Sequence, residues 1–155
     1  MKTYFSIIKT NLGNIYAEAT NKNLIKLYWT NKQIKNQKQT KNRILVNLEK
    51  QLINYLKGKK IKFNIPLYMK GSVFQKKVWK NLQKLNWGEK KSYSEISEKI
   101  SQNKKSARAV GNACSKNPIL IVVPCHRVIS SNGKFGGYKE GLNKKKKLLE
   151  LEKII

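Results

Sequence analysis

The most apolar run in the chain, residues 119–123, leads directly into a cysteine and a histidine. The run reads Ile-Leu-Ile-Val-Val and is followed by Pro124, Cys125 and His126. A short continuous apolar run is typical of a buried strand, so any fold of this chain has to bury these residues. We therefore predict a buried strand that holds the Cys125 thiol at one place inside the protein.

The neighbouring Cys125 and His126 suggest chemistry. His126 is the only histidine in 155 residues, and Cys125 is one of two cysteines. The thiolate is the reactive form of cysteine, and a basic neighbour is the usual way to produce it. A second interpretation is an inert core thiol. The chain has no aspartate, so a third catalytic member would be a glutamate, an asparagine or a backbone group.

The charge of the chain is strongly positive, at +26 from 34 basic residues and eight glutamates. Only three of the basic residues are arginines, and lysine binds phosphate as a point charge. The expected partner is a polyanion, nucleic acid first and an anionic membrane surface second. The alternative is that the lysine excess reflects the base composition of the source genome.

Missing features exclude several classes of protein. The chain has no run of eighteen apolar residues, so no membrane span is predicted. Its first residues also lack the apolar segment of a secretory signal. Cys114, Cys125 and His126 lack the spacing of a zinc site, and there is no P-loop or dinucleotide fingerprint. We therefore expect no metal and no cofactor. Two cysteines fit a reducing compartment, the cytoplasm or a eukaryotic nucleus.

The first part of the chain, residues 1–66, is predicted to be a small α/β domain. Segments rich in aromatic and β-branched residues alternate with turn residues, and one segment has apolar residues at helical spacing. The predicted elements are strands over residues 4–8, 15–19, 24–29 and 61–65 and a helix over residues 42–57. Residues 30–40 are predicted as a loop or a frayed helix start, and residues 66–71 as a linker.

The second part, residues 67–155, is predicted to be mostly helical. Ser72 with Gln75, and Ser92 with Glu95, match the capping box that begins a helix. Two helices are predicted to begin directly after these serines, and the first has an apolar face from Phe74 to Leu85. Two further helices are predicted over residues 106–116 and 142–155. The polar turn over residues 101–105 completes the outline of a helix-turn-helix. The glycine-rich residues 133–141 are predicted as a loop that lets the backbone approach a ligand.

The segment over residues 106–116 is unusually slim for a helix. Arg108 is its one bulky residue among several alanines and a glycine. Such a helix could press its backbone into a narrow groove with Arg108 projecting alone. It could equally be one half of a tightly packed helix pair, which also uses small residues.

Together these segments resemble the O6-alkylguanine-DNA alkyltransferases. The matching segments are residues 71–75, 88, 92–93, 107–111, 117–118, 121–129, 136–138 and 148–152. They cover more than half of the chain in the right order, whereas residues 1–66 match only in general character. The resemblance implies an α+β fold, with a small ribonuclease-H-like α/β domain followed by a mostly helical domain of helix-turn-helix or winged-helix type.

The resemblance also implies a role for each matching residue. Cys125 would take the alkyl group, His126 would remove the thiol proton through a water, and Glu152 would orient His126. Asn117 would brace the turn before the cysteine, and Tyr93 would help to rotate the nucleotide and protonate the leaving guanine. Arg108 would fill the gap in the base stack, with its helix in the minor groove. The other implied DNA contacts are Ala107, Ala109, Gly111 and Ala113. The implied pocket residues are Pro124, Val128, Ser130, Gly136, Gly137, Tyr138 and Lys139.

The implied reaction is direct repair of O6-alkylguanine in double-stranded DNA, with O4-alkylthymine as a second candidate substrate. A thioether has no easy leaving group, so each molecule would act once, and we expect it to act as a monomer. Two alternatives stay open. One is a non-enzymatic lesion binder of the same fold, which typically lacks the cysteine. The other is an unrelated thiol hydrolase with a merely compositional charge.

Three departures from the family pattern carry expectations. Residues 1–66 contain no cysteine or histidine, so we predict no structural zinc there. Lys139 and Glu140 stand where some relatives carry smaller residues, so we expect them to narrow the pocket against bulky adducts. The lysine run over residues 144–147 lies at the start of a predicted helix, where the dipole disfavours cations. It is either a solvated face or a contact to DNA phosphate.

Overall fold

The computed structural model describes residues 1–31 and 40–155. It divides into two compact units, Met1–Met69 and Lys70–Ile155, and the boundary falls inside the linker predicted over residues 66–71. The first unit is a small sheet with one helix and the second is mostly helical, so the predicted α+β class is confirmed. Among the described residues no helix is both long and apolar enough to cross a membrane.

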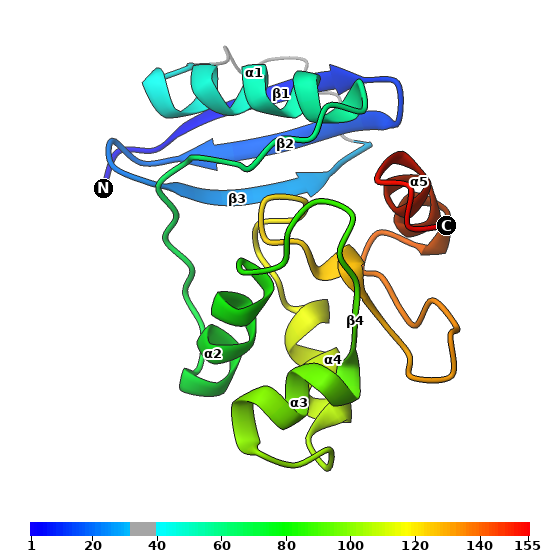
Figure 1. Cartoon of the computed structure of the whole chain (residues 1–155). Coiled ribbons are helices and arrows are strands. Elements are labelled where there is room, and N and C mark those ends of the chain that lie inside the picture. Colours follow the sequence, from blue (N-terminus) through cyan, green and yellow to red (C-terminus); the bar gives the residue numbers. More distant parts are fainter. Residues whose placement is uncertain (32–39) are drawn as a thin grey trace. The chain divides into compact units, whose positions relative to one another are not determined.

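The first unit is a three-stranded antiparallel sheet with a helix over one face (Figure 1). Its strands are β1 (Tyr4–Thr10), β2 (Gly13–Ala19) and β3 (Leu24–Trp29), in the order β1-β2-β3. All three predicted strands of this sheet are confirmed. Side chains of β2 alternate between the core and the other face, as expected for a half-buried strand.

Helix α1 (Arg43–Leu56) supplies the other side of this core. Leu45, Leu48 and Leu52 lie at helical spacing and are fully buried. Asn42 begins the helix, because its side chain accepts a hydrogen bond from the Leu45 N–H. The predicted helix over residues 42–57 is therefore confirmed.

The predicted strand over residues 61–65 is wrong. The Gln51 side chain of α1 accepts from the Asn64 N–H at 2.8 Å and donates to the Asn64 carbonyl at 3.2 Å, which occupies the groups a ladder would need. The chain instead makes one isolated bridge, Leu24 to Leu67, beside β3. Most of the loop predicted over residues 30–40 lies outside the described residues.

Both predicted capping boxes of the second unit are confirmed. Ser72 begins α2 (Val73–Leu82) and Ser92 begins α3 (Tyr93–Ser101), each with the reciprocal hydrogen bonds of the motif. Helix α4 spans Ala107–Ser115 and α5 spans Leu142–Leu151. Helix α5 ends four residues before the predicted position, and Glu152 follows it as the C-cap.

The turn between α3 and α4 is held by polar side chains. The buried Ser97 hydroxyl donates to the Asn103 carbonyl at 2.8 Å and accepts from the Ser106 N–H at 3.1 Å. Gln102 ends α3 in the left-handed conformation, with φ of 60°, which turns the chain sharply. The two helices therefore form the predicted helix-turn-helix outline (Figure 1).

The apolar run over residues 119–123 is buried as predicted except for the half-buried Val122, but it forms a turn and not a strand. Ile121 has a φ of 70°, which is costly for a β-branched residue. The buried Asn117 side chain accepts from the Ile119 N–H at 2.9 Å and donates to the Val123 carbonyl at 2.8 Å. These two hydrogen bonds take the place of those that a neighbouring strand would make, so the backbone folds back on itself directly before Cys125.

Two short strands follow the cysteine segment. The 3₁₀ turn η1 (Cys125–Arg127) leads into β5 (Val128–Ile129), which pairs in parallel with β4 (Lys91–Ser92). Because β4 leads directly into α3, this pairing places the start of α3 beside the cysteine segment.

Candidate active site

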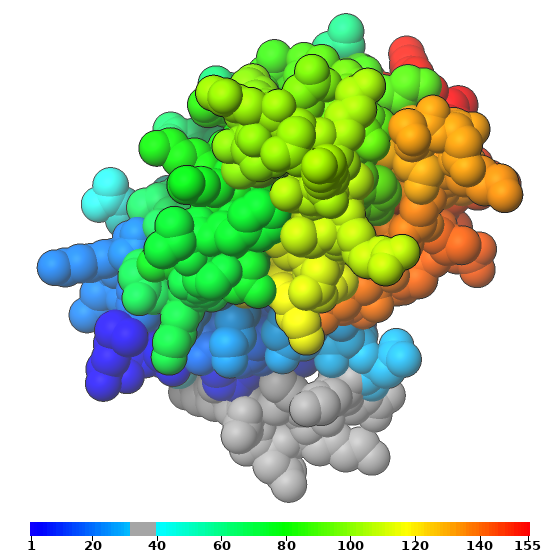
Figure 2. Space-filling model, turned by 90° about the horizontal axis from the view of Figure 1, so that it is seen from below, coloured from blue at the N-terminus to red at the C-terminus, as the bar shows by residue number. Residues whose placement is uncertain are grey.

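Cys125 lies at the wall of a cavity of about 640 Å³ and is 4 % exposed. Tyr93 of α3, Arg108 and Gly111 of α4, and Tyr138 of the glycine-rich loop line the same cavity. Figure 2 shows this face of the second unit, with the yellow-green surface of α3 and α4 next to the orange surface of the loop. The chain therefore brings the thiol, the exposed arginine and the loop to one hollow.

The Cys125 thiol is protected at rest. Burial raises its pKa, and a hydrogen bond from the Asn117 side chain and the positive charge of Lys145 lower it in part. A thiol with a raised pKa is protonated at neutral pH and reacts slowly with chance electrophiles. Its use as a nucleophile then requires a base that removes its proton.

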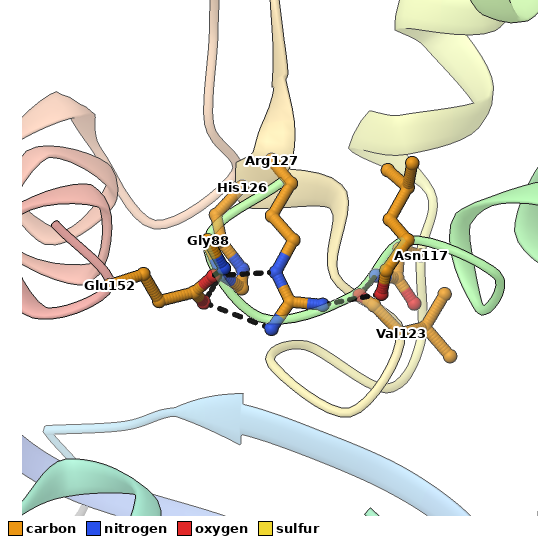
Figure 3. A network of polar contacts seen from close by, with 7 residues as sticks. Gly88, Asn117, Val123, His126, Arg127 and Glu152 are labelled. Carbon is orange, nitrogen blue, oxygen red and sulfur yellow. Dashed lines mark hydrogen bonds and ion pairs between the residues drawn. The ribbon is translucent and has the colours of Figure 1, made fainter. Parts of the chain in front are cut away.

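A buried carboxylate, Glu152, holds the groups beside the cysteine together (Figure 3). His126 Nε2 lies 2.6 Å from Glu152 Oε2. Arg127 donates from Nε to Oε1 at 2.7 Å and from Nη2 to Oε2 at 3.1 Å. The Gly88 N–H donates to Oε1 at 3.0 Å, and Arg127 Nη1 reaches the Leu85 carbonyl at 2.7 Å.

These contacts decide the charge of Glu152. Burial alone raises the pKa of a carboxyl group, but the hydrogen bonds and charges of His126 and Arg127 prevail and lower it to about 2. Four hydrogen bonds to one carboxylate have this effect because they favour its charged form. Glu152 is therefore an anion throughout the physiological pH range.

His126 is neutral at rest. Burial lowers its pKa, and the hydrogen bond and charge of Glu152 oppose this. The carboxylate only accepts hydrogen bonds, so the hydrogen-bond network assigns the ring proton to Nε2. The lone pair then lies on Nδ1, and that nitrogen is the one able to accept a proton.

Tyr93 approaches the cavity because Gly136 leaves room for its ring. A Cβ on Gly136 would lie 2.7 Å from the Tyr93 hydroxyl, and Gly136 has a φ of +69°, so both sterics and backbone favour glycine there. A Cβ on Gly111 would lie 3.7 Å from the ring, an ordinary contact distance, so this position does not require glycine. Burial raises the pKa of Tyr93 to about 12, which keeps its hydroxyl protonated.

Helix α4 buries one face of small residues and leaves the opposite face exposed. Val110, Ala113 and Cys114 are buried, and the Ala113 carbonyl accepts from Trp79 Nε1 of α2 at 2.9 Å. Arg108 and Ala109 are exposed on the opposite face, and Ala107 and Gly111 are half-buried. The expected DNA contact at Ala113 is therefore wrong, because this residue packs against α2.

The predicted pocket residues divide into two groups. The cavity is lined by Ser130, Gly136, Gly137, Tyr138 and Lys139, as expected. Pro124 and Val128 are buried and are not among its lining residues, so their place in the base pocket stays a prediction. Val128 instead presents its carbonyl to Lys145, at 2.6 Å from Nζ.

Two buried cations of the site were not predicted. No role is predicted for Arg127, although it directly follows His126 in the matching segment. Lys145 is not distinguished from its neighbours by the lysine run itself, but residues 145, 148, 149 and 152 have the spacing of one helix face. That spacing was the signal, because Leu148, Leu149 and Glu152 are also buried.

Metal-ligating residues do not gather in the described part of the chain. No group of three or more histidine, cysteine or acidic side chains there is placed to hold a metal ion.

Family models match almost the whole chain. Residues 3–69 match the ribonuclease-like domain of 6-O-methylguanine DNA methyltransferase, and residues 73–154 match its DNA binding domain. The chain belongs to the 6-O-methylguanine DNA methyltransferase family. The resemblance found from the sequence motifs is thereby confirmed.

Members of this family with known sequences and structures are similar to the chain. A methylated-DNA–protein-cysteine methyltransferase of Metallosphaera sedula is 46 % identical over 72 % of this chain and 69 % of its own length. One from Methanosarcina mazei is 51 % identical over 66 % of this chain and 64 % of its own length. The crystal structure of Mycobacterium tuberculosis OGT in complex with DNA has a TM-score of 0.86 at 36 % identity, covering 96 % of this chain and 92 % of that one.

The charge of Glu152 predicts a specific pH dependence of stability. Its folded pKa of about 2 lies below the ordinary value of 4.5, so ionisation stabilises the fold above pH 4.5 and this contribution disappears as the pH falls toward 2. Glu152→Gln should cost roughly 3 kcal/mol at pH 7. The difference from the unchanged protein should shrink below pH 4.5 in urea unfolding at each pH.

Glu150→Gln is the matched control, because Glu150 is an exposed carboxylate on the same helix. It should change the free energy of unfolding by no more than about 0.5 kcal/mol. An equal cost of Glu152→Gln at pH 7 and pH 3 would contradict the buried carboxylate.

Proposed function

We propose that the protein repairs DNA directly, by transferring the alkyl group of O6-alkylguanine to the sulfur of its own Cys125. The observation that carries this proposal is the single cavity shared by Cys125, Tyr93 and Arg108, with the His126–Glu152 pair buried at the cysteine turn. A lesion binder needs no such thiol with its own base. Family membership supports the same activity.

The proposal requires the damaged base to leave the duplex. An O6-alkyl group inside double-stranded DNA is out of reach of a thiol that is 4 % exposed, so the nucleotide has to rotate into the cavity. The exposed face of α4 is slim around Arg108, which suits a narrow minor groove. Arg108 then occupies the space that the rotated base leaves in the stack.

The proton of Cys125 moves first. In the proposed step His126 Nδ1 takes it through a water, and the Glu152 carboxylate stabilises the imidazolium that forms. Burial lowers the pKa of His126 and Glu152 opposes that effect, so the imidazole stays neutral at rest and gains a proton only in this step. Asn117 holds the turn that aims the thiol.

The thiolate then attacks the saturated carbon of the adduct. The carbon–sulfur bond forms, the bond from that carbon to guanine O6 breaks, and its electron pair stays with the guanine. Tyr93 is placed to donate a proton to the departing base, since its hydroxyl is kept protonated inside the same cavity. Restored guanine and S-alkylcysteine are the products.

Each protein molecule can carry out this reaction only once. A thioether has no easy leaving group, and Cys114, the other cysteine, is itself buried with a raised pKa. We propose single turnover on double-stranded DNA carrying O6-alkylguanine, by a protein acting as a monomer, with O4-alkylthymine as a candidate second substrate. Lys139 at the cavity wall is proposed to limit the size of the adduct.

The decisive test is to incubate the protein with duplex DNA containing one O6-methylguanine. One methyl group should appear on Cys125 by peptide mass spectrometry, guanine should be restored, and repair should stop at one equivalent. Cys125→Ser should bind the DNA and transfer nothing. Tight binding with unmodified Cys125 in the unchanged protein would favour a lesion binder and contradict the proposal.

A separate prediction concerns Arg108. Arg108→Ala should slow transfer from duplex DNA by about 10- to 100-fold, because the cost of unstacking a base is no longer offset. It should leave the reaction with the free base O6-benzylguanine unchanged, since that substrate needs no rotation.

Lys104→Ala controls for the lost positive charge, because Lys104 is an exposed cation in the turn before α4. It should weaken binding slightly without a change in the transfer rate at saturating DNA. An equal loss for Arg108→Ala with free base and duplex would assign Arg108 to the pocket and not to the base stack.

A further inference from the structure

Lys145 is a fully buried lysine that contacts two residues of the cavity wall, Tyr93 and Gly137. Its relative exposure is 0 %, although it belongs to a run of four lysines. A buried ammonium group is costly unless its donors are used. The Nζ group donates to the Val128 carbonyl at 2.6 Å and to the Gly137 carbonyl at 3.0 Å, so the interior is built to hold it.

The same ammonium contacts Tyr93. Its Nζ atom lies 3.4 Å from the Tyr93 hydroxyl and 5.7 Å from the centre of the ring, a distance at which a cation and an aromatic ring attract each other. One group therefore ties together the start of α3, the strand that follows Cys125 and the glycine-rich loop. Tyr93 and the glycine-rich loop line the cavity that receives the base in the proposed function.

Neither earlier interpretation of this lysine run fits Lys145. A side chain with no exposure is not part of a solvated face and does not reach a DNA phosphate. Lys146 and Lys147 are exposed, as a solvated face requires. Lys145 alone of the run points into the unit, on the helix face shared with Leu148, Leu149 and Glu152.

We propose that Lys145 is a positioning residue for alkyl transfer, which holds Tyr93 and the glycine-rich loop in place and supplies a positive charge beside the reacting sulfur. The inference rests on the proposed transfer to Cys125. A cation at this place stabilises the thiolate as it forms, because opposite charges interact strongly in a water-poor cavity. This charge acts on the cysteine of the protein, whereas other cations bind the DNA.

The titratable groups around Lys145 set its charge. They are Tyr93 on α3, Cys114 on α4, and Cys125 and His126 in the cysteine turn. Burial lowers the pKa of Lys145 to about 8, and the two thiols oppose this when they ionise. The cation is present below pH 8 and is lost above it.

The test compares Lys145→Met with Lys146→Met, which removes the same charge from the exposed face of the same helix. Lys145→Met should slow single-turnover transfer from O6-methylguanine duplex at saturating DNA by about tenfold at pH 7, the effect of raising the thiol pKa by one. The rising limb of its rate–pH profile should move to higher pH. Lys146→Met should match the unchanged protein in both measurements, and Lys145→Met should bind the duplex as tightly as the unchanged protein, since Lys145 reaches no phosphate.

Lys145→Arg separates charge from packing. It should return the rising limb to its original pH even where the larger side chain lowers the rate. If Lys145→Met does not fold, the profile of the unchanged protein decides: the rate should rise, then fall above about pH 8 as Lys145 loses its proton.

Several results would overturn the inference. They are an unshifted profile for Lys145→Met, a shift that Lys145→Arg fails to reverse, or a rate of the unchanged protein that rises without a maximum to pH 10. Failure of the proposed function is distinguishable, because then the unchanged protein methylates no Cys125 at any pH. If the unchanged protein and Lys145→Met are both active and their rate–pH profiles coincide, only the role proposed for Lys145 is refuted.

Discussion

The hydrogen bonds to the buried Glu152 carboxylate support both the fold of the second unit and its chemistry. They join the end of α5, the cysteine turn and the loop at Gly88 (Figure 3). A buried carboxylate is costly, and here Arg127 offsets the cost with two charge-assisted hydrogen bonds. The same anion fixes the tautomer of His126, so a change that weakens it affects stability and proton transfer together.

Two interior cations have different surroundings and so different behaviour. Arg127 is paired with a full negative charge, whereas Lys145 is held by neutral carbonyl oxygens and a hydroxyl. The pKa of Lys145 is consequently lowered by burial to about 8. On a chain with a net charge of +26, most lysines are surface charges that favour a polyanion. Lys145 instead contacts Tyr93 and Gly137, which line the cavity that holds the Cys125 thiol.

Local patterns predicted the elements whose stabilising contacts are local. Ser72 and Ser92 begin their helices through residues three positions away, and the strands of the first sheet pair with their neighbours in sequence. The failures at residues 61–65 and 119–123 share one cause, since amide side chains of Gln51 and Asn117 hydrogen-bond to the backbone there. Composition left glutamate, asparagine or backbone open as the partner of His126, and only the family resemblance pointed to Glu152.

The most direct test of the Glu152 interaction is nitrogen NMR of the imidazole ring, because His126 is the only histidine and gives one unambiguous pair of resonances. A neutral ring with its proton on Nε2 is predicted at pH 7 and above, since burial lowers the pKa of His126 while Glu152 accepts from Nε2. A resting imidazolium at pH 7, or a neutral ring protonated on Nδ1, would contradict the proposed proton transfer from Cys125.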